Sequence, residues 1–205
     1  MPTKRNKPSR PARAPTQNFP HGLARTRDLE AKGASRPVIR RMVDAGQLRR
    51  VARGLYAPAD LEATEHHGLA AAAALVPGGV VCLLSALQYH RLGTQAPFEV
   101  WLAIGIKSRK PTITDPPLRI VRFSERALRE GVETRSIEGV KVRVTTPART
   151  VVDCFKYRNK IGLDVALEAL REYRRARRSI DDLTRAADVV RVSNVMRPYL
   201  ESVLA

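Results

Sequence analysis

The sequence has few of the residues from which metal and catalytic sites are built. Its 205 residues include two cysteines and four histidines. Cys82 and Cys154 lack the short spacing of metal ligands, so we expect two buried thiols in a reducing compartment. His66 and His67 are neighbours on an expected helix and point about 100° apart, which prevents them from sharing one metal ion. The sequence therefore predicts no metal site.

Sequence patterns of common enzyme classes are also missing. No glycine-rich phosphate loop occurs, and Ser85, His90 and Asp153 lack the nucleophile elbow that a hydrolase triad of this kind would need. A metal-dependent nuclease needs acidic residues on a pair of strands, whereas the acidic residues after Asp153 fall on expected helices. We expect a protein that is not an enzyme and that binds no cofactor.

Long apolar segments are absent as well. The longest candidate, residues 69–76, is rich in alanine and ends at Pro77, far short of the roughly 18 residues that a membrane helix needs. The basic start of the chain has no apolar stretch behind it and does not resemble a secretory signal. We expect a cytoplasmic protein with no membrane partner.

Acidic residues are scarce compared with basic ones. The chain has 37 Lys and Arg against 20 Asp and Glu, a formal net charge of +17. Residues 1–60 hold 14 basic and 4 acidic side chains and so carry more than half of this excess. A chain this basic attracts polyanions at long range, and nucleic acid is the usual one. The alternative is a solubilising tail with solvated basic faces.

Composition divides the chain into three parts. Residues 1–18 mix Lys, Arg, Pro and Ser without periodic apolar positions, so we expect a disordered basic arm. Pro58 and Asp60 mark a change of composition. We therefore place a DNA-binding domain at residues 19–60 and a second domain at residues 61–205.

The first domain has the pattern of two helices followed by a hairpin. A short helix is expected over residues 20–32. Ser35 and Pro37 suit the start of a second helix, which Gly46 ends. Arg53-Gly54 suits a tight turn between two short strands. This order of elements is that of a winged helix-turn-helix.

The second helix directs basic side chains away from its buried apolar stripe. Arg36 and Arg40 lie one turn apart near its N-terminus, the part of a recognition helix that reaches base edges in the major groove. Arginine there can bind guanine O6 and N7, and the hairpin arginines are placed for backbone or minor-groove contacts. The expected DNA-binding residues are Ser35, Arg36, Arg40, Arg41, Arg49, Arg50 and Arg53. The alternative is an exposed amphipathic helix with solvated arginines.

The remainder of the chain mixes both element types and then becomes helical. The apolar patterns and caps predict a helix over 61–76, a helix capped by Ser85, strands over 98–104 and 118–123, a hairpin turning at Glu138-Gly139, a helix capped by Thr146, and three helices near 162–175, 180–190 and 193–204. The expected fold class is α+β: an N-terminal winged helix-turn-helix followed by a mixed α/β domain with a helical C-terminal half.

Five arginines occur within eight residues at the end of the helix near 162–175. The helix dipole accounts for one or two such cations. We expect a second basic surface that binds a polyanion, with a solvated helix face as the alternative. Its residues are Arg171, Arg174, Arg175 and Arg178. Nearby, Arg149 and Asp153 are four residues apart and form either a functional surface or a simple helix ion pair.

These motifs resemble those of a known family. The stretch from Thr26 to Asp60, with Val51-Ala52-Arg53-Gly54-Leu55-Tyr56 closing the wing, is similar to the N-terminal domain of the AbiEi antitoxins. Ser85-Ala86-Leu87, the Thr-Pro-Ala-Arg-Thr-Val-Val-Asp motif at 146–153 and the helical tail resemble the C-terminal domain of the same family. The resemblance therefore covers residues 20–205.

The resemblance implies an antitoxin of a type IV toxin–antitoxin system, which acts in abortive infection and phage defence. Such an antitoxin represses its own operon by binding operator DNA, often at inverted repeats. It counters a nucleotidyltransferase-like toxin without needing to form a stable complex with it. The alternative is a winged-helix transcriptional regulator that has no toxin partner.

Overall fold

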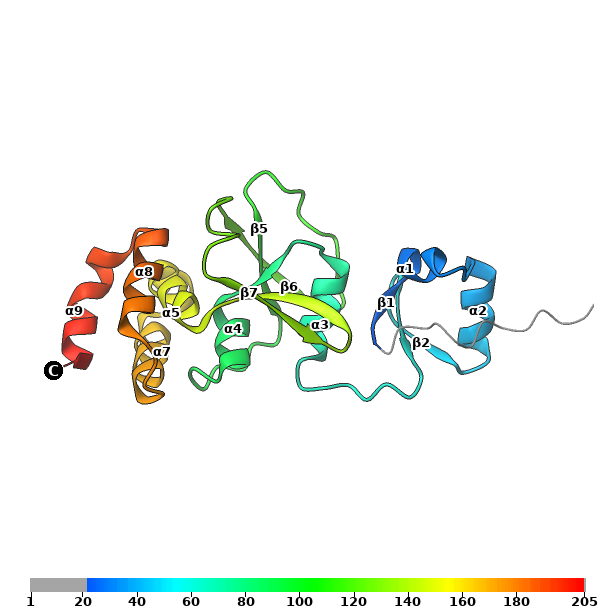
Figure 1. The fold of residues 1–205 in the computed structure, drawn as a ribbon, viewed down its shortest axis with the longest axis horizontal. Helices are drawn as coiled ribbons and strands as arrows, with labels where there is room; N and C mark the ends of the chain where they lie inside the picture. The colour runs from blue at the N-terminus through cyan, green and yellow to red at the C-terminus, as the bar shows by residue number, and fades with distance from the viewer. Residues whose placement is uncertain (1–21, 205) are drawn as a thin grey trace, which may run out of the picture.

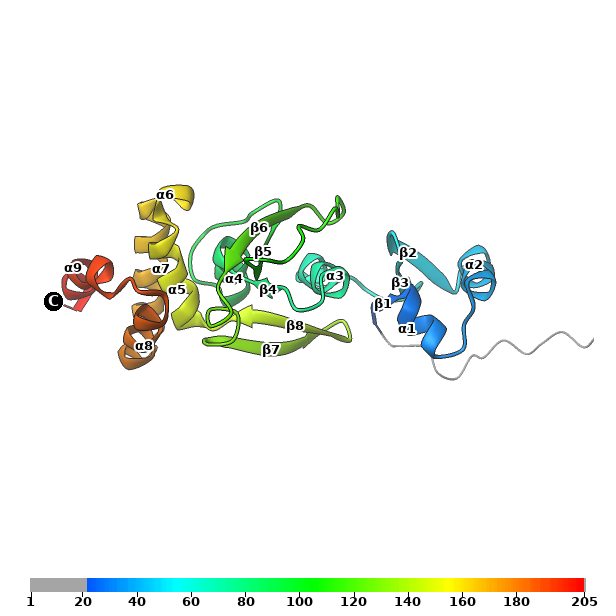
Figure 2. The ribbon, with the colours of Figure 1, turned by 90° about the horizontal axis from the view of Figure 1, so that it is seen from above.

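The computed structural model describes residues 22–204 of the chain, so the basic arm expected over 1–18 lies outside the described residues. The described part is elongated, with an N-terminal module, a central sheet and a group of helices following one another along its long axis (Figure 1). The view from above shows the same order (Figure 2). The fold is of the expected α+β class, with a helical C-terminal half.

The N-terminal module is a three-stranded antiparallel sheet with two helices on one face. Its elements are β1 (Ala24–Arg25), α1 (Thr26–Ala31), α2 (Arg36–Asp44), β2 (Leu48–Ala52) and β3 (Leu55–Pro58), with strand order β1-β3-β2. Leu29, Ile39, Met42 and Leu48 are buried between the helices and this sheet. The arrangement is a helix-turn-helix followed by a wing, as the sequence predicts.

The first helix is shorter than the expected range of 20–32. Ala24 and Arg25 pair with β3 as a third strand, and α1 begins only at Thr26. The Asp28 carboxylate accepts hydrogen bonds from the backbone N–H of Arg25 (3.3 Å) and from its Nε (2.9 Å), which fixes the start of the helix. A strand of two residues has no recognisable period, so the apolar pattern gave no indication of it.

The other face of the wing sheet packs against the rest of the chain. Leu55 and Ala57 are fully buried in a core shared with α3 (His67–Leu75) and the strands behind it. In both views α3 lies between the module and the central sheet (Figures 1 and 2). The helix expected over 61–76 therefore begins late, because residues 61–66 form the connection that crosses from the wing sheet to α3.

The central sheet has five strands of mixed direction. They are β4 (Val80–Val81), β5 (Val100–Gly105), β6 (Leu118–Phe123), β7 (Val132–Ile137) and β8 (Val140–Thr145), in the order β6-β5-β4-β8-β7. The β5–β6 and β4–β8 pairs are parallel, and the other two are antiparallel. The two expected strands and the hairpin at Glu138-Gly139 are confirmed.

Ser85 does not cap the helix for which it was expected to be the N-cap. That helix, α4 (Leu83–His90), begins after Cys82, and Ser85 lies inside it with 3% of its surface exposed. The Ser85 Oγ accepts a hydrogen bond from the backbone N–H of Trp101 (2.9 Å). Ser85 therefore joins α4 to the start of β5, a role that depends on a residue distant in sequence.

Most of the C-terminal helices lie where their caps predict. They are α5 (Pro147–Lys156), α6 (Arg158–Ile161), α7 (Leu163–Arg175), α8 (Ile180–Val190) and α9 (Ser193–Leu204). The Thr146 hydroxyl accepts from the N–H of Arg149 (3.4 Å), and the Ser179 hydroxyl accepts from that of Asp182 (3.2 Å). Both expected N-caps are confirmed. Only the short α6 was not expected.

Candidate nucleic-acid interface

Helix α2 presents a basic outer face because its apolar residues are spaced for burial. Ile39 and Met42 are buried, whereas Arg36, Arg40 and Arg41 are exposed. Ser35 occupies the N-cap position with extended backbone angles, but its hydroxyl makes no capping hydrogen bond. The Ser35 hydroxyl and the backbone N–H groups of Arg36 and Val38 can therefore bind an anionic ligand, whereas Pro37 has no N–H to offer.

Helix α2 and the wing line one groove. Its volume is about 460 Å³. Within β2 and β3, Arg50 lies directly opposite Tyr56, which places both on the sheet face that α2 covers. The lining residues are Thr26, Arg36, Ile39, Arg40, Val43, Arg50, Gly54 and Tyr56. Three arginines from two elements therefore converge on a single groove.

The other expected wing residues lie elsewhere. Arg53 is exposed at the tip of the wing, beside Gly54, which has the positive φ of 77° that the turn requires. Arg49 lies on the opposite face of the sheet, where its Nη2 donates a hydrogen bond to the carbonyl oxygen of Leu61 (3.2 Å). Arg41 is exposed on α2 and does not line the groove.

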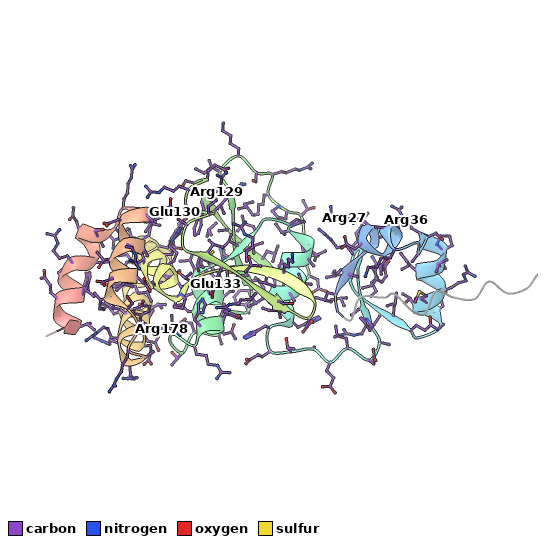
Figure 3. The ribbon with its side chains drawn as sticks, in the orientation of Figure 1. Arg27, Arg36, Arg129, Glu130, Glu133 and Arg178 are labelled. Atoms are coloured by element: carbon purple, nitrogen blue, oxygen red, sulfur yellow. The ribbon has the colours of Figure 1, made fainter. Side chains whose placement is uncertain are left out.

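Arg36 is held by a residue that sequence reasoning missed. Its Nε donates to the Glu30 carboxylate at 3.1 Å, while the Arg36 side chain remains 82% exposed. Figure 3 labels Arg36 and the exposed Arg27, both on the N-terminal module. Because Glu30 binds only Nε, the two terminal nitrogens of Arg36 remain available for a ligand. Glu30 lies six residues away across a turn, a spacing with no regular helical or strand pattern.

The arginines expected to form a second basic surface, at residues 171–178, differ in their location and exposure. Helix α7 ends at Arg175, so Arg178 is in the following turn and not on the helix, contrary to expectation. Arg171 and Arg175 are exposed, whereas Arg174 and Arg178 are half-buried. The Nε atoms of both half-buried arginines are inaccessible to solvent and lack a hydrogen-bond partner among the described residues.

Arg149 and Asp153 form a buried ion pair and contribute no surface. Their side chains are 1% and 0% exposed, and Arg149 Nε donates to Asp153 Oδ1 at 2.9 Å. Arg149 Nη1 also donates to the carbonyl oxygens of Ala127 (3.2 Å) and Glu130 (2.7 Å), so it ties α5 to the loop before β7. Of the two interpretations, the helix ion pair is confirmed and the functional surface is excluded, because both side chains are buried.

Two further observations limit the chemistry of the described residues. Between residues 22 and 204, no three His, Cys, Asp or Glu side chains gather as a metal site would require. No helix in the same range is long and apolar enough to cross a membrane.

Comparison with known proteins agrees with this geometry. The fold is similar to that of the RV2827C protein from Mycobacterium tuberculosis, with a TM-score of 0.58 and 16% identity over 89% of this chain and 72% of that one. No curated protein sequence matches the chain. Residues 20–59, a range that includes the helix-turn-helix and wing, match a family model described as "Transcriptional regulator, AbiEi antitoxin". The N-terminal module is thus similar to a domain of the AbiEi antitoxin family of transcriptional regulators.

Proposed function

We propose that this protein is the antitoxin of a type IV toxin–antitoxin system and represses its own operon by binding operator DNA. The observation that carries the proposal is the groove where Arg36 and Arg40 of α2 meet Arg50 of the wing. The family match of residues 20–59 supports a regulatory role. The formal net charge of +17 supports a polyanionic partner.

In this proposal the N-terminal turn of α2 enters the major groove. Arg36 and Arg40 bind base edges, where a bidentate arginine can distinguish guanine from other bases. Arg50 and Arg53 contact the phosphate backbone on either side and fix the register of the helix. Ser35 and the free N–H groups of α2 hold one phosphate. Arg49, on the other sheet face, positions the connection at Leu61 instead of touching DNA.

The second domain is proposed to counter the toxin, a nucleotidyltransferase-like enzyme, without a requirement for a stable complex. Two copies on an inverted repeat would place one α2 in each half-site. The exposed arginines Arg171 and Arg175 are proposed to contribute to a second polyanion surface on this domain. A winged-helix regulator without a toxin partner remains the second candidate, and growth of cells that co-express the neighbouring gene distinguishes the two.

The DNA-binding proposal is tested by fluorescence anisotropy with the DNA upstream of the gene and with random DNA of equal length. Arg40→Ala should cost about 1–3 kcal/mol on the upstream DNA and much less on random DNA, because a base contact is lost. Arg49→Ala removes the same charge from the other sheet face and serves as the matched control. Equal losses for the two variants, or equal losses on the two DNAs, would contradict base reading by Arg40.

A further inference from the structure

A second hollow lies far along the molecule from the helix-turn-helix. It consists of two cavities of about 510 and 840 Å³ that share Pro147 and Arg178 as lining residues. The smaller cavity is bounded by the start of α5 and by α8, and the larger one by the end of α4, by β7 and by the connection before α3. Both volumes fall in the range of about 300–1,000 Å³ that is typical of small-ligand sites.

Arg178 is exceptional among the charged side chains that line this cleft. Each of the others has an oppositely charged partner: Arg91 with Glu65, Arg135 with Glu133, Arg149 with Asp153, Arg185 with Asp182, Glu130 with Arg126, and Glu138 with His67. Among the described residues, Arg178 forms no ion pair, and its buried Nε has no hydrogen-bond partner. A half-buried guanidinium without a partner is unfavourable unless an anion binds it.

The larger cavity also has an aromatic wall. The rings of His66 and Tyr89 lie 4.8 Å apart, and both residues line the cavity together with Arg178. His90 adds no positive charge there at neutral pH, since burial lowers its pKa. The hydrogen bond that its Nε2 donates to the carbonyl oxygen of Thr145 (2.6 Å) acts in the opposite direction but does not outweigh burial. The cavity therefore combines one unpaired cation with an aromatic surface.

From this combination we propose that the cleft binds a nucleotide, with a phosphate group on Arg178 and the base against Tyr89 and His66. The arginine fork matches phosphate geometry, and aromatic rings accept any base by stacking. Figure 3 shows Arg178 and Glu133 where the C-terminal helices meet the sheet, well separated from Arg27 and Arg36. The ligand is thus distinct from the DNA bound at α2, and the inference does not depend on the DNA-binding proposal.

The test is isothermal titration calorimetry of the full chain with ATP, GTP and pyrophosphate, in the presence of saturating duplex DNA to occupy the basic N-terminal module. Arg178→Gln should weaken nucleotide and pyrophosphate binding roughly tenfold or more, as expected for loss of charge-assisted hydrogen bonds. Arg197→Gln, an equal charge change at an exposed position of α9 outside both cavities, should leave both unchanged. Tyr89→Leu should weaken nucleotide binding but retain that of pyrophosphate.

Three outcomes would overturn the proposal: no binding by the parent chain, equal losses for Arg178→Gln and Arg197→Gln, or binding of pyrophosphate as tight as that of nucleotides. The second outcome would mean non-specific attraction to a basic surface, and the third a simple anion site. Arg178→Lys, which keeps the charge without the fork, covers the case in which Arg178→Gln fails to fold. It should retain part of the binding.

Discussion

Asp153 is a carboxyl group that the fold buries completely beside Arg149. Burial raises its pKa to about 6 from the ordinary value of 3.8, although the charge and the hydrogen bond of Arg149 act in the opposite direction. Asp153 Oδ2 and Arg149 Nη2 have no hydrogen-bond partner among the described residues. The pair therefore orders the junction of α5 with the loop before β7 at an energetic cost that depends on pH.

Because of this raised pKa, Asp153 makes the stability of the fold fall as the pH rises. The folded chain binds a proton at this site up to about pH 6, whereas the unfolded chain releases it near 3.8. The contribution of protonated Asp153 to the free energy of unfolding is therefore complete below pH 3.8 and is lost as the pH rises through 6. Asp153→Asn should remove this dependence, as measured by urea unfolding across that range. Asp164→Asn, at an exposed site, should leave it intact, and parallel curves for Asp153→Asn and the parent would refute the assignment.

At the scale of elements, the β7–β8 hairpin joins the winged module to the second domain. The Glu138 side chain, 2% exposed, accepts hydrogen bonds from Thr64 N–H (2.8 Å) and Thr64 Oγ1 (2.9 Å) and contacts His67 Nδ1 (2.7 Å). Its carbonyl oxygen accepts from the N–H of Leu23 (3.0 Å). Burial opposes ionisation of Glu138, but the hydrogen bonds from Thr64 and His67 outweigh it and lower its pKa. The tip of the β7–β8 hairpin is thus hydrogen-bonded both to the segment before the module, at Leu23, and to the segment after it, at Thr64.

Removal of this side chain should loosen the module. Glu138→Ala should lower the free energy of unfolding by roughly 2–3 kcal/mol, since hydrogen bonds to a charged group are worth about 1.5–3 kcal/mol each. It should also speed proteolytic cleavage within residues 59–66. Glu133→Ala, in the strand β7 that leads to Glu138 but paired with the exposed Arg135, is the control and should change stability by less than about 1 kcal/mol. Unchanged cleavage in Glu138→Ala would show that the shared apolar core alone fixes the module.

At the scale of the whole molecule, the wing sheet is covered on both faces. Helices α1 and α2 bury one face, and α3 with the strands behind it buries the other, including Leu23, Leu55 and Ala57. A boundary near residue 60 therefore separates two segments of the chain that share a hydrophobic core. The two segments to which we assign DNA binding and toxin relief therefore stabilise each other through this core.

A fragment of residues 1–60 should accordingly be less stable than the same residues in the full chain. Exposing two buried leucines costs about 1.5–3 kcal/mol each, a large share of the roughly 5–15 kcal/mol that stabilises a domain. Thermal unfolding by circular dichroism should show a lower and broader transition for the fragment. Its preferred DNA sequence should not change, because the groove of α2 is retained. A fragment that melts cooperatively at the temperature of the full chain would contradict this prediction.

The local signals of the sequence were reliable where a single turn or cap decided the element. Thr146, Ser179 and Glu138-Gly139 each lie where their conformational preferences placed them. The prediction that Ser85 is an N-cap was wrong, because its hydroxyl accepts a hydrogen bond from Trp101, 16 residues away in sequence, instead of from its own helix. The short strands β1 and β4 exist only because longer strands pair with them, and two residues carry no periodic pattern.

The sequence by itself determined the helix-turn-helix, the basic outer face of α2 and the α+β order of elements, since periodicity, caps and charge are local properties. Only the tertiary structure decided which arginines act together. The tertiary structure brings Arg50 into the groove with Arg36 and Arg40 and places Arg49 on the other sheet face. It also buries Arg149 and leaves Arg178 unpaired in a cleft. The physical reason is that a side chain's direction follows from local structure, whereas its partners come from segments that only folding brings together.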